Sequence, residues 1–194
     1  MNKGERTREF ILNRGMLHSS QFGLAGITIG SMAKLCGLSR TGVISHFKNK
    51  DDMQMAILDY SQQQFIKQVL APAKQPDALL QLQTLLQRWQ NWTQQVFKQE
   101  ASSCPFIKAL VEYEHRTDSS VRAHALRQQK DLLSFLTKTI VRAQRQGSVR
   151  ADEKAKDIAL ELYSLYVGLT SAASFVAPRS SQLVLQKALQ RYIR

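Results

Sequence analysis

Residues 28–47 read TIGSMAKLCGLSRTGVISHF, and this stretch decides the fold of the N-terminal part of the chain. Thr28 is a favourable N-cap residue, so the pattern predicts a helix over 29–36. Gly37 follows, where the end of a helix favours a left-handed residue. A serine two positions later is placed to cap a second helix, expected over 40–47. Two short helices joined by a turn of about three residues that contains glycine predict a helix-turn-helix.

The apolar residues of this stretch are spaced so that the two helices can pack on each other. Ala33 is small, which suits a close crossing of two helices, and Val43 can pack back onto the first helix. Met32, Leu38 and Phe47 complete an apolar underside. The remaining positions of the second helix are polar, so we expect it to expose hydrogen-bonding groups.

An exposed polar helix of this kind suits the major groove of DNA, where the second helix of a helix-turn-helix places its N-terminal residues on base edges. Arg40 can pair with guanine O6 and N7, the commonest specific base contact. A phosphate can accept from groups at the start of the first helix. For His46, packing beside the following phenylalanine is at least as good an interpretation. The predicted DNA-contacting residues are Thr28, Ser39, Arg40, Thr41, Gly42, Ser45, His46 and Lys50.

The charge of the chain is concentrated in the same region. The formal net charge is +12, and residues 1–50 carry eight basic against two acidic residues, which is half of that excess. A basic excess indicates an anionic partner, which can be nucleic acid, a membrane surface or an acidic protein. Its concentration favours an anion-binding module over a merely solvated basic face.

The rest of the chain is expected to be helical throughout, because glycine and proline are sparse and no long stretch alternates in the manner of a strand. Gly23 is expected to end the first helix and Gly147 a long later one. The whole chain therefore predicts an all-α fold of about nine helices. Besides the two short helices, we expect helices over 5–21, 50–70, 77–97, a short stretch from 105, 118–146, 152–173 and 180–193.

The composition favours a cytoplasmic protein that has no membrane span. The chain starts with MNKGERTREF, which lacks the apolar core of a signal peptide. The longest uncharged run, 162–178, is slightly short for a membrane span and rich in small residues. Two cysteines cannot form a disulfide framework, so a reducing compartment fits.

The stretch from about residue 6 to 65 resembles the N-terminal DNA-binding domain of the TetR family of bacterial transcriptional regulators. The chain departs from the common pattern at Ile44 and Gly42, where many members have tyrosine and threonine, and at His18, which replaces an apolar residue. CPF at 104–106 and ELYSLYVG at 161–168 resemble a subset of the family. The N-terminal resemblance is carried by Ile11-Leu12, Gly23, TIGSMA, CGLS, His46-Phe47 and Lys50.

The resemblance implies a DNA-binding domain over 1–50, a connecting helix over 50–70, and a ligand-binding and dimerisation domain within 51–194. It also implies a homodimeric repressor that leaves a palindromic operator when a small-molecule effector binds. The helix expected over 152–173 independently permits a dimer, because it is apolar nearly all round and must be buried on more than one side. An entirely intramolecular core is the alternative. The expected dimer residues are Leu162, Leu165, Tyr166, Leu169, Leu185, Leu189 and Tyr192.

The resemblance further implies a small-molecule pocket, although an aromatic stripe at helical spacing is more often ordinary core. The effector is not identified by the sequence, and we expect no cofactor and no metal. The candidate pocket residues are Trp89, Trp92, Phe106, Leu110, Tyr113 and Phe135.

The sequence also offers three alternatives to a transcriptional regulator. Glu112 and His115 have the Glu-x-x-His spacing of paired-metal helical bundles, but the second motif that such sites need is missing, so we expect an exposed charged face and no enzyme. Cys104 precedes Pro105 near a helix start and can act as a redox switch, although a buried thiol is commoner. A basic protein that coats DNA without sequence preference is the third alternative.

Overall fold

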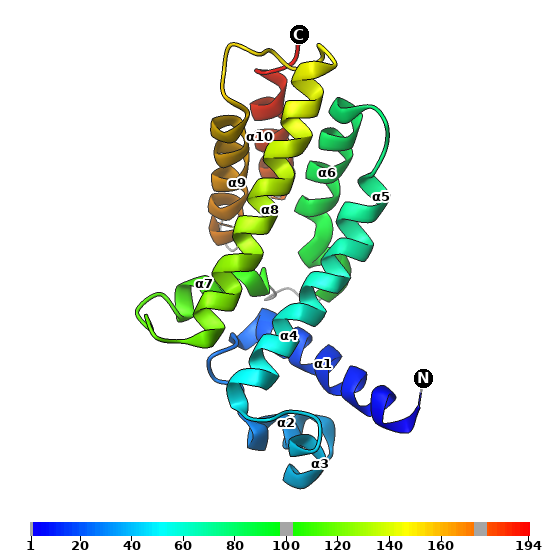
Figure 1. Cartoon of the computed structure of the whole chain (residues 1–194), viewed down its shortest axis with the longest axis vertical. Helices are drawn as coiled ribbons and strands as arrows, with labels where there is room; N and C mark the ends of the chain where they lie inside the picture. The colour runs from blue at the N-terminus through cyan, green and yellow to red at the C-terminus, as the bar shows by residue number, and fades with distance from the viewer. Residues whose placement is uncertain (1, 98–102, 173–177) are drawn as a thin grey trace. The chain divides into compact units, whose positions relative to one another are not determined.

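The computed structural model describes residues 2–97, 103–172 and 178–194, and within them it confirms the all-α prediction (Figure 1). The described residues also contain an isolated antiparallel β-bridge between Val149 and Ile193. The described helices are α1 (Lys3–Phe22), α2 (Ile29–Cys36), α3 (Arg40–Ile44), α4 (Lys50–Phe65), the π-helical η1 (Ile66–Leu70), α5 (Ala71–Ala73), α6 (Ala78–Phe97), α7 (Pro105–Glu112), α8 (Ser120–Arg145), α9 (Ala155–Ala172) and α10 (Pro178–Gln190).

Two predicted boundaries are corrected. The helix expected over 50–70 continues to Ala73 as α4, η1 and α5, and the π-helical η1 directly precedes this last turn, in which Pro72 lacks an N–H and crowds the carbonyl four residues earlier. The second helix of the helix-turn-helix ends at Ile44 instead of Phe47. Its last turn tightens, with the His46 N–H donating to the Val43 carbonyl at 3.0 Å, a bond between residues three apart.

The contacts between residues divide the chain into two compact units. The first consists of Met1–Gln64 and Ser102–Gln128, and the second of Phe65–Ala101 and Gln129–Arg194. Helix α7 and the beginning of α8 therefore belong with the N-terminal helices. The functional boundary expected near residue 50 stays a prediction.

In the first unit, α1 approaches α4 closely at Gly15. Helix α1 begins at Lys3, earlier than expected, because Asn2 and Glu5 form a reciprocal capping box. Gly15 is buried on α1, and a Cβ atom placed on it would lie 2.5 Å from Cδ1 of Ile57 on α4. Glycine therefore lets these two helices approach closely. Gly23 ends α1 as predicted, with φ 87°.

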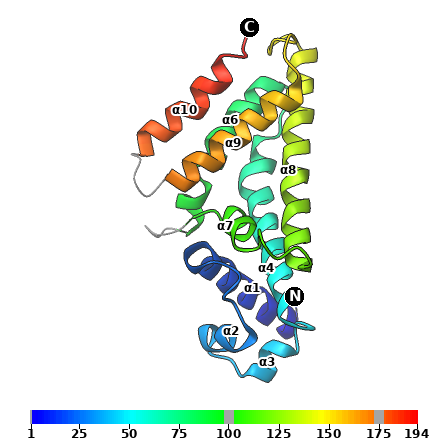
Figure 2. The same ribbon diagram turned by 90° about the vertical axis from the view of Figure 1, so that its left-hand side faces the viewer.

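The second unit contains α6, α9 and α10, and α10 lies beside α9 in both views (Figures 1 and 2). Trp89 of α6 stacks on Tyr166 of α9 with ring centroids 4.1 Å apart. Phe65 packs edge-on against Trp92, with centroids 5.1 Å apart. These aromatic side chains form part of the core of this unit.

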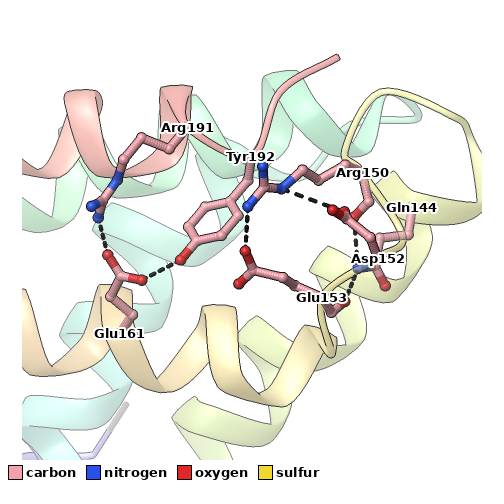
Figure 3. A network of polar contacts seen from close by, with 7 residues as sticks. All are labelled: Gln144, Arg150, Asp152, Glu153, Glu161, Arg191 and Tyr192. Atoms are coloured by element: carbon pink, nitrogen blue, oxygen red, sulfur yellow. Dashed lines mark hydrogen bonds and ion pairs between the residues drawn. The ribbon is translucent and has the colours of Figure 1, made fainter.

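The end of the chain is held in the second unit by a polar network (Figure 3). Glu161 of α9 accepts from the Tyr192 hydroxyl and pairs with Arg191. Arg150 pairs with Glu153, and its guanidinium lies 5.4 Å from the centre of the Tyr192 ring. The hydrogen bond to Glu161, together with burial, raises the pKa of Tyr192 to about 12.

Among the described residues, no helix is both long enough and apolar enough to cross a membrane.

Candidate nucleic-acid interface

Helix α2 begins at a reciprocal cap, as the sequence predicts. The Thr28 Oγ1 atom accepts from the Ser31 N–H at 3.0 Å, and the Ser31 Oγ atom accepts from the Thr28 N–H at 2.8 Å. Both polar groups that Thr28 was expected to offer to a phosphate are thus used within the cap. Thr28 as a DNA contact stays a prediction that requires this cap to open or share its donors.

The turn between α2 and α3 has the expected geometry. Gly37 is left-handed, with φ 65° and ψ 32°. The Leu38 N–H donates to the Ala33 carbonyl at 2.9 Å, which satisfies an end group of α2. Ser39 then caps α3, its Oγ atom accepting from the Gly42 N–H at 2.9 Å. Local sequence therefore forms both ends of the turn.

Helix α3 buries one side and exposes the other. Val43 is fully buried, and of the predicted apolar underside Met32 and Phe47 are buried while Leu38 is half-buried. Arg40, Thr41 and the other polar residues of the outer face are solvent-exposed or half-buried. Such a helix presents hydrogen-bonding groups to a groove without losing its anchor in the core.

Ile44, Ser45 and His46 need a closer description. Ile44, where many family members have tyrosine, is an apolar side chain that is 55% exposed. The Ser45 hydroxyl donates to the Gly42 carbonyl of its own helix at 3.0 Å, so only its acceptor capacity is free for a base. The His46 ring lies edge-on to Phe47 with centroids 6.4 Å apart, the packing that was offered as its alternative.

Lys50 has a structural partner that the sequence could not indicate. Its Nζ atom donates to the carbonyl of Ala25, 3.1 Å away. An ammonium group has three donors, so two remain for a phosphate. On α1, the guanidinium of Arg8 lies 5.3 Å from the centre of the Phe47 ring, which places another positive charge beside α3.

Helix α7 is hydrogen-bonded to the connection between α1 and α2. The Glu112 carboxylate accepts from the backbone N–H groups of Leu24 and Ala25 at 2.7 and 2.9 Å. Gly23 makes this possible, because a Cβ atom there would lie 1.5 Å from Oε1 of Glu112. Glu112 is therefore half-buried and engaged, which corrects the exposed charged face expected for this segment.

Lys108 on α7 and Tyr113, which directly follows the helix, make further contacts of this kind. The Lys108 ammonium donates to the Gln21 carbonyl at 2.6 Å, and burial lowers the pKa of Lys108 while the Glu112 charge opposes that shift. The Tyr113 hydroxyl donates to Oε1 of buried Gln54 at 2.6 Å. Chiefly through burial, the pKa of Tyr113 is raised to about 12. We call Lys108, Glu112 and Tyr113 the α7 latch.

Gln54 carries the latch onward to the start of the helix-turn-helix. Its Nε2 atom donates to the carbonyls of Leu24 and Ile27, each 2.9 Å away. Ile27 directly precedes the capping residue of α2. A continuous set of hydrogen bonds therefore runs from α7 to the beginning of α2.

The six candidate pocket residues are divided between the two units. Trp89, Trp92 and Phe135 belong to the second unit, where both tryptophans are buried in aromatic packing. The other three belong to the first, where Phe106 and Tyr113 are buried and Leu110 is half-buried. The bond from Tyr113 to Gln54 gives that residue a structural role. Their function as a ligand pocket stays a prediction.

Most of the expected dimer residues are buried within a single chain. Leu162, Tyr166, Leu185, Leu189 and Tyr192 have little or no exposed surface. This burial matches the intramolecular alternative, because a side chain covered by its own chain has no surface to offer a second copy. Leu165 and Leu169 are half-buried and stay available.

The remaining alternatives meet specific obstacles. Within the described residues, no group of three or more His, Cys, Asp or Glu side chains is arranged to hold a metal ion. Glu112 binds backbone amides, and His115 is exposed at the helix end. Cys104 is only 2% exposed, and buried structural thiols are inert.

The capped helix-turn-helix near the N-terminus, with its polar outer face, places this helical chain in the class of helix-turn-helix proteins. A family model described as the tetracyclin repressor-like C-terminal domain matches residues 78–187, which is more than half of the chain. The chain therefore belongs to the tetracycline-repressor-like, or TetR, family. This confirms the resemblance seen in the sequence.

Solved structures share the fold at low sequence identity. A TetR transcriptional regulator from Chloroflexus aurantiacus has a TM-score of 0.85 at 17% identity, covering 100% of this chain and 99% of its own. A TetR-family regulator from Agrobacterium tumefaciens has a TM-score of 0.84 at 16% identity, with coverages of 99% and 100%. AibR, solved with isovaleryl coenzyme A and operator DNA, has a TM-score of 0.71 at 16% identity, with coverages of 94% and 98%. No curated protein matches the chain in sequence.

Proposed function

We propose that this chain is a cytoplasmic, sequence-specific DNA-binding regulator of transcription that acts as a homodimeric repressor on a palindromic operator. The observation that carries this proposal is α3, a capped helix with a buried apolar back and an exposed face of Arg40, Thr41 and Ser45. Such a helix has the donors and acceptors that base edges require. The concentration of positive charge in residues 1–50 supports the same partner.

The fold also supports this function. Membership of the TetR family favours a regulator over an enzyme. AibR, a structural neighbour, was solved bound to operator DNA and to isovaleryl coenzyme A. We propose that the present chain likewise responds to a small-molecule effector, whose chemistry is left open.

For the dimer, the exposed apolar residues of α9 and α10 are better candidates than the buried ones. Leu160 on α9, and Leu183 and Val184 on α10, are exposed. A shallow hollow along α9 is lined by Glu161, Ser164, Leu165, Gly168, Leu169 and Ala172. The small residues in this hollow permit a helix of a second copy to approach closely. A two-fold dimer would read the two halves of a palindrome.

The α7 latch is the proposed route from effector to DNA. Phe106 and Leu110, two candidate ligand residues, are on the same helix as Lys108 and Glu112. An effector that prefers a displaced α7 would pull on the connection between α1 and α2. By linkage, that effector would weaken the binding of DNA.

Selection from a random duplex library at about 150 mM salt, followed by sequencing of the bound fraction, tests the proposal. Enrichment of a two-fold symmetric site supports a sequence-specific dimer, and light scattering of the free protein checks its mass. Binding without enrichment would indicate the sequence-neutral coating protein instead. An absence of binding would contradict both.

A further inference from the structure

Arg40 and Gly30 form an unusual contact across the helix-turn-helix. Gly30 lies in the first turn of α2, and Arg40 is the first residue of α3. A Cβ atom placed on Gly30 would lie 3.3 Å from Nη2, 3.4 Å from Nε and 3.6 Å from Cζ of Arg40. Nη2 and Nε are nearer than Cζ, so the guanidinium turns its Nε–Nη2 edge toward Gly30.

The backbone does not explain the glycine. The left-handed glycines are Gly23, Gly37 and Gly147, and Gly30 is not among them. Glycine destabilises a helix relative to alanine. The three atoms nearest to a Cβ placed on Gly30 all belong to Arg40. The absence of a side chain on Gly30 therefore leaves room for this guanidinium.

The donors of Arg40 are available in this arrangement. Within the described residues, Arg40 has no hydrogen bond and no ion pair, and its side chain is exposed. Nη1 is not among the three atoms nearest to Gly30, and the N–H groups of Nη1 and Nη2 form a fork of donors that guanine O6 and N7 can accept. Restricting a long side chain in advance also reduces the entropy lost on binding.

We propose that Gly30 is a specificity-determining residue that acts through Arg40. It touches no base itself, and its missing side chain sets where the Arg40 guanidinium lies and therefore which base pair the guanidinium reads. This inference rests on the proposed function, since it concerns how the operator is discriminated.

The test is library selection with the full chain and five variants, followed by competition binding on the selected site. Arg40→Ala should lose preference at one base pair per half-site, by about tenfold. Gly30→Leu, which adds bulk without hydrogen-bonding groups, should lose preference at that same base pair. The double variant should be no worse than Arg40→Ala alone, because both changes remove one interaction.

Gly30→Ala separates positioning from folding. Its added methyl group crowds the guanidinium and should lower the preference at the same base pair by a smaller factor. Thermal unfolding should show a stability equal to or above that of the native chain, because alanine favours the helix. Gly26→Ala is the matched control, since a Cβ atom there meets nothing within 4 Å and should leave the selected site unchanged.

The outcomes distinguish the inference from the function on which it rests. If the native chain selects no site, the proposed function fails and takes the inference with it. If the native chain selects a site, and Gly30→Leu keeps the preference or changes it at a base pair that Arg40→Ala does not affect, the inference alone is overturned.

Discussion

A single carboxylate decides how the start of the helix-turn-helix is held. Glu112 accepts from two backbone N–H groups of residues 24 and 25, which no helix or strand would otherwise satisfy. The left-handed Gly23 leaves room for the carboxylate. Hydrogen bonds to a charged group are stronger than neutral ones, so this one side chain orders a loop that precedes α2.

Glu112→Gln should lower the free energy of unfolding by about 1–3 kcal/mol, because Oε2 accepts from both N–H groups and a neutral amide oxygen in its place is a weaker acceptor. Urea unfolding measures this loss. Glu114→Gln is the control, because Glu114 is exposed two residues away and should change stability by less than about 0.5 kcal/mol. Equal effects of the two substitutions would contradict the assigned role of Glu112.

At the scale of elements, the packing of α1 on α4 depends on the absence of a side chain. Gly15 lies against fully buried Ile57, whose Cδ1 and Cγ1 atoms would be 2.5 and 2.7 Å from an added Cβ atom. The isoleucine is enclosed by the core and cannot rotate away freely. The two helices can therefore keep their separation only with glycine at this position.

Gly15→Ala should destabilise the chain by about 1–3 kcal/mol, although alanine favours a helix over glycine. The sign of the change is diagnostic, since overpacking must exceed the gain in helix propensity. Gly4→Ala on the same helix serves as control, because its nearest atom is a surface side-chain oxygen at 3.4 Å. That control should leave stability unchanged or raise it. A stabilising Gly15→Ala in thermal unfolding would show that α1 and α4 pack less closely.

At the scale of the whole molecule, one tyrosine in each compact unit makes the stability of the fold depend on alkaline pH. Tyr113 in the first unit and Tyr192 in the second each have a pKa raised to about 12. An unfolded tyrosine has a pKa of about 10, so the folded state retains protons that the unfolded state has lost between these values. Their contribution to stability is complete below pH of about 10 and disappears as the pH rises toward 12.

The free energy of unfolding should therefore fall between pH 10 and 12, and Tyr113→Phe with Tyr192→Phe should flatten that fall. Denaturant unfolding at a series of pH values measures the slope. The native chain in the same buffers supplies the reference, since its lysines titrate in both proteins. An unchanged slope in the double variant would exclude the two tyrosines as its source.

The net charge of +12 also makes DNA binding a property of the whole molecule. Lys50→Ala should weaken binding to all sequences alike and reduce the slope of log affinity against log salt by about 1, as expected for one lost phosphate contact. Lys130→Ala, an exposed lysine of α8, should leave that slope unchanged. Filter binding over a range of salt concentrations measures both. Loss of preference at one base pair in Lys50→Ala would instead indicate a base contact.

Local sequence alone was sufficient for the helix-turn-helix. The cap at Thr28, the left-handed Gly37 and the cap at Ser39 each depend on residues within three or four positions. Because these caps are hydrogen bonds between residues close in sequence, they could be predicted from the sequence. The apolar side of α3 could be predicted from the spacing of its residues. The prediction for 50–70 was wrong at its end, because the helical run passes through Pro72 to Ala73 by way of the π-helical η1.

Tertiary structure alone decided which side chains are engaged. Glu112 and its partner Leu24 are 88 positions apart, and Lys50 and Ala25 are 25 apart. It likewise covered Tyr192 and Leu185, which the helical pattern could equally have assigned to a dimer. Periodicity identifies an apolar face, and only the fold determines what covers that face. The sequence by itself therefore determined the all-α class and the helix-turn-helix, while long-range packing decided which residues hold the helix-turn-helix in place.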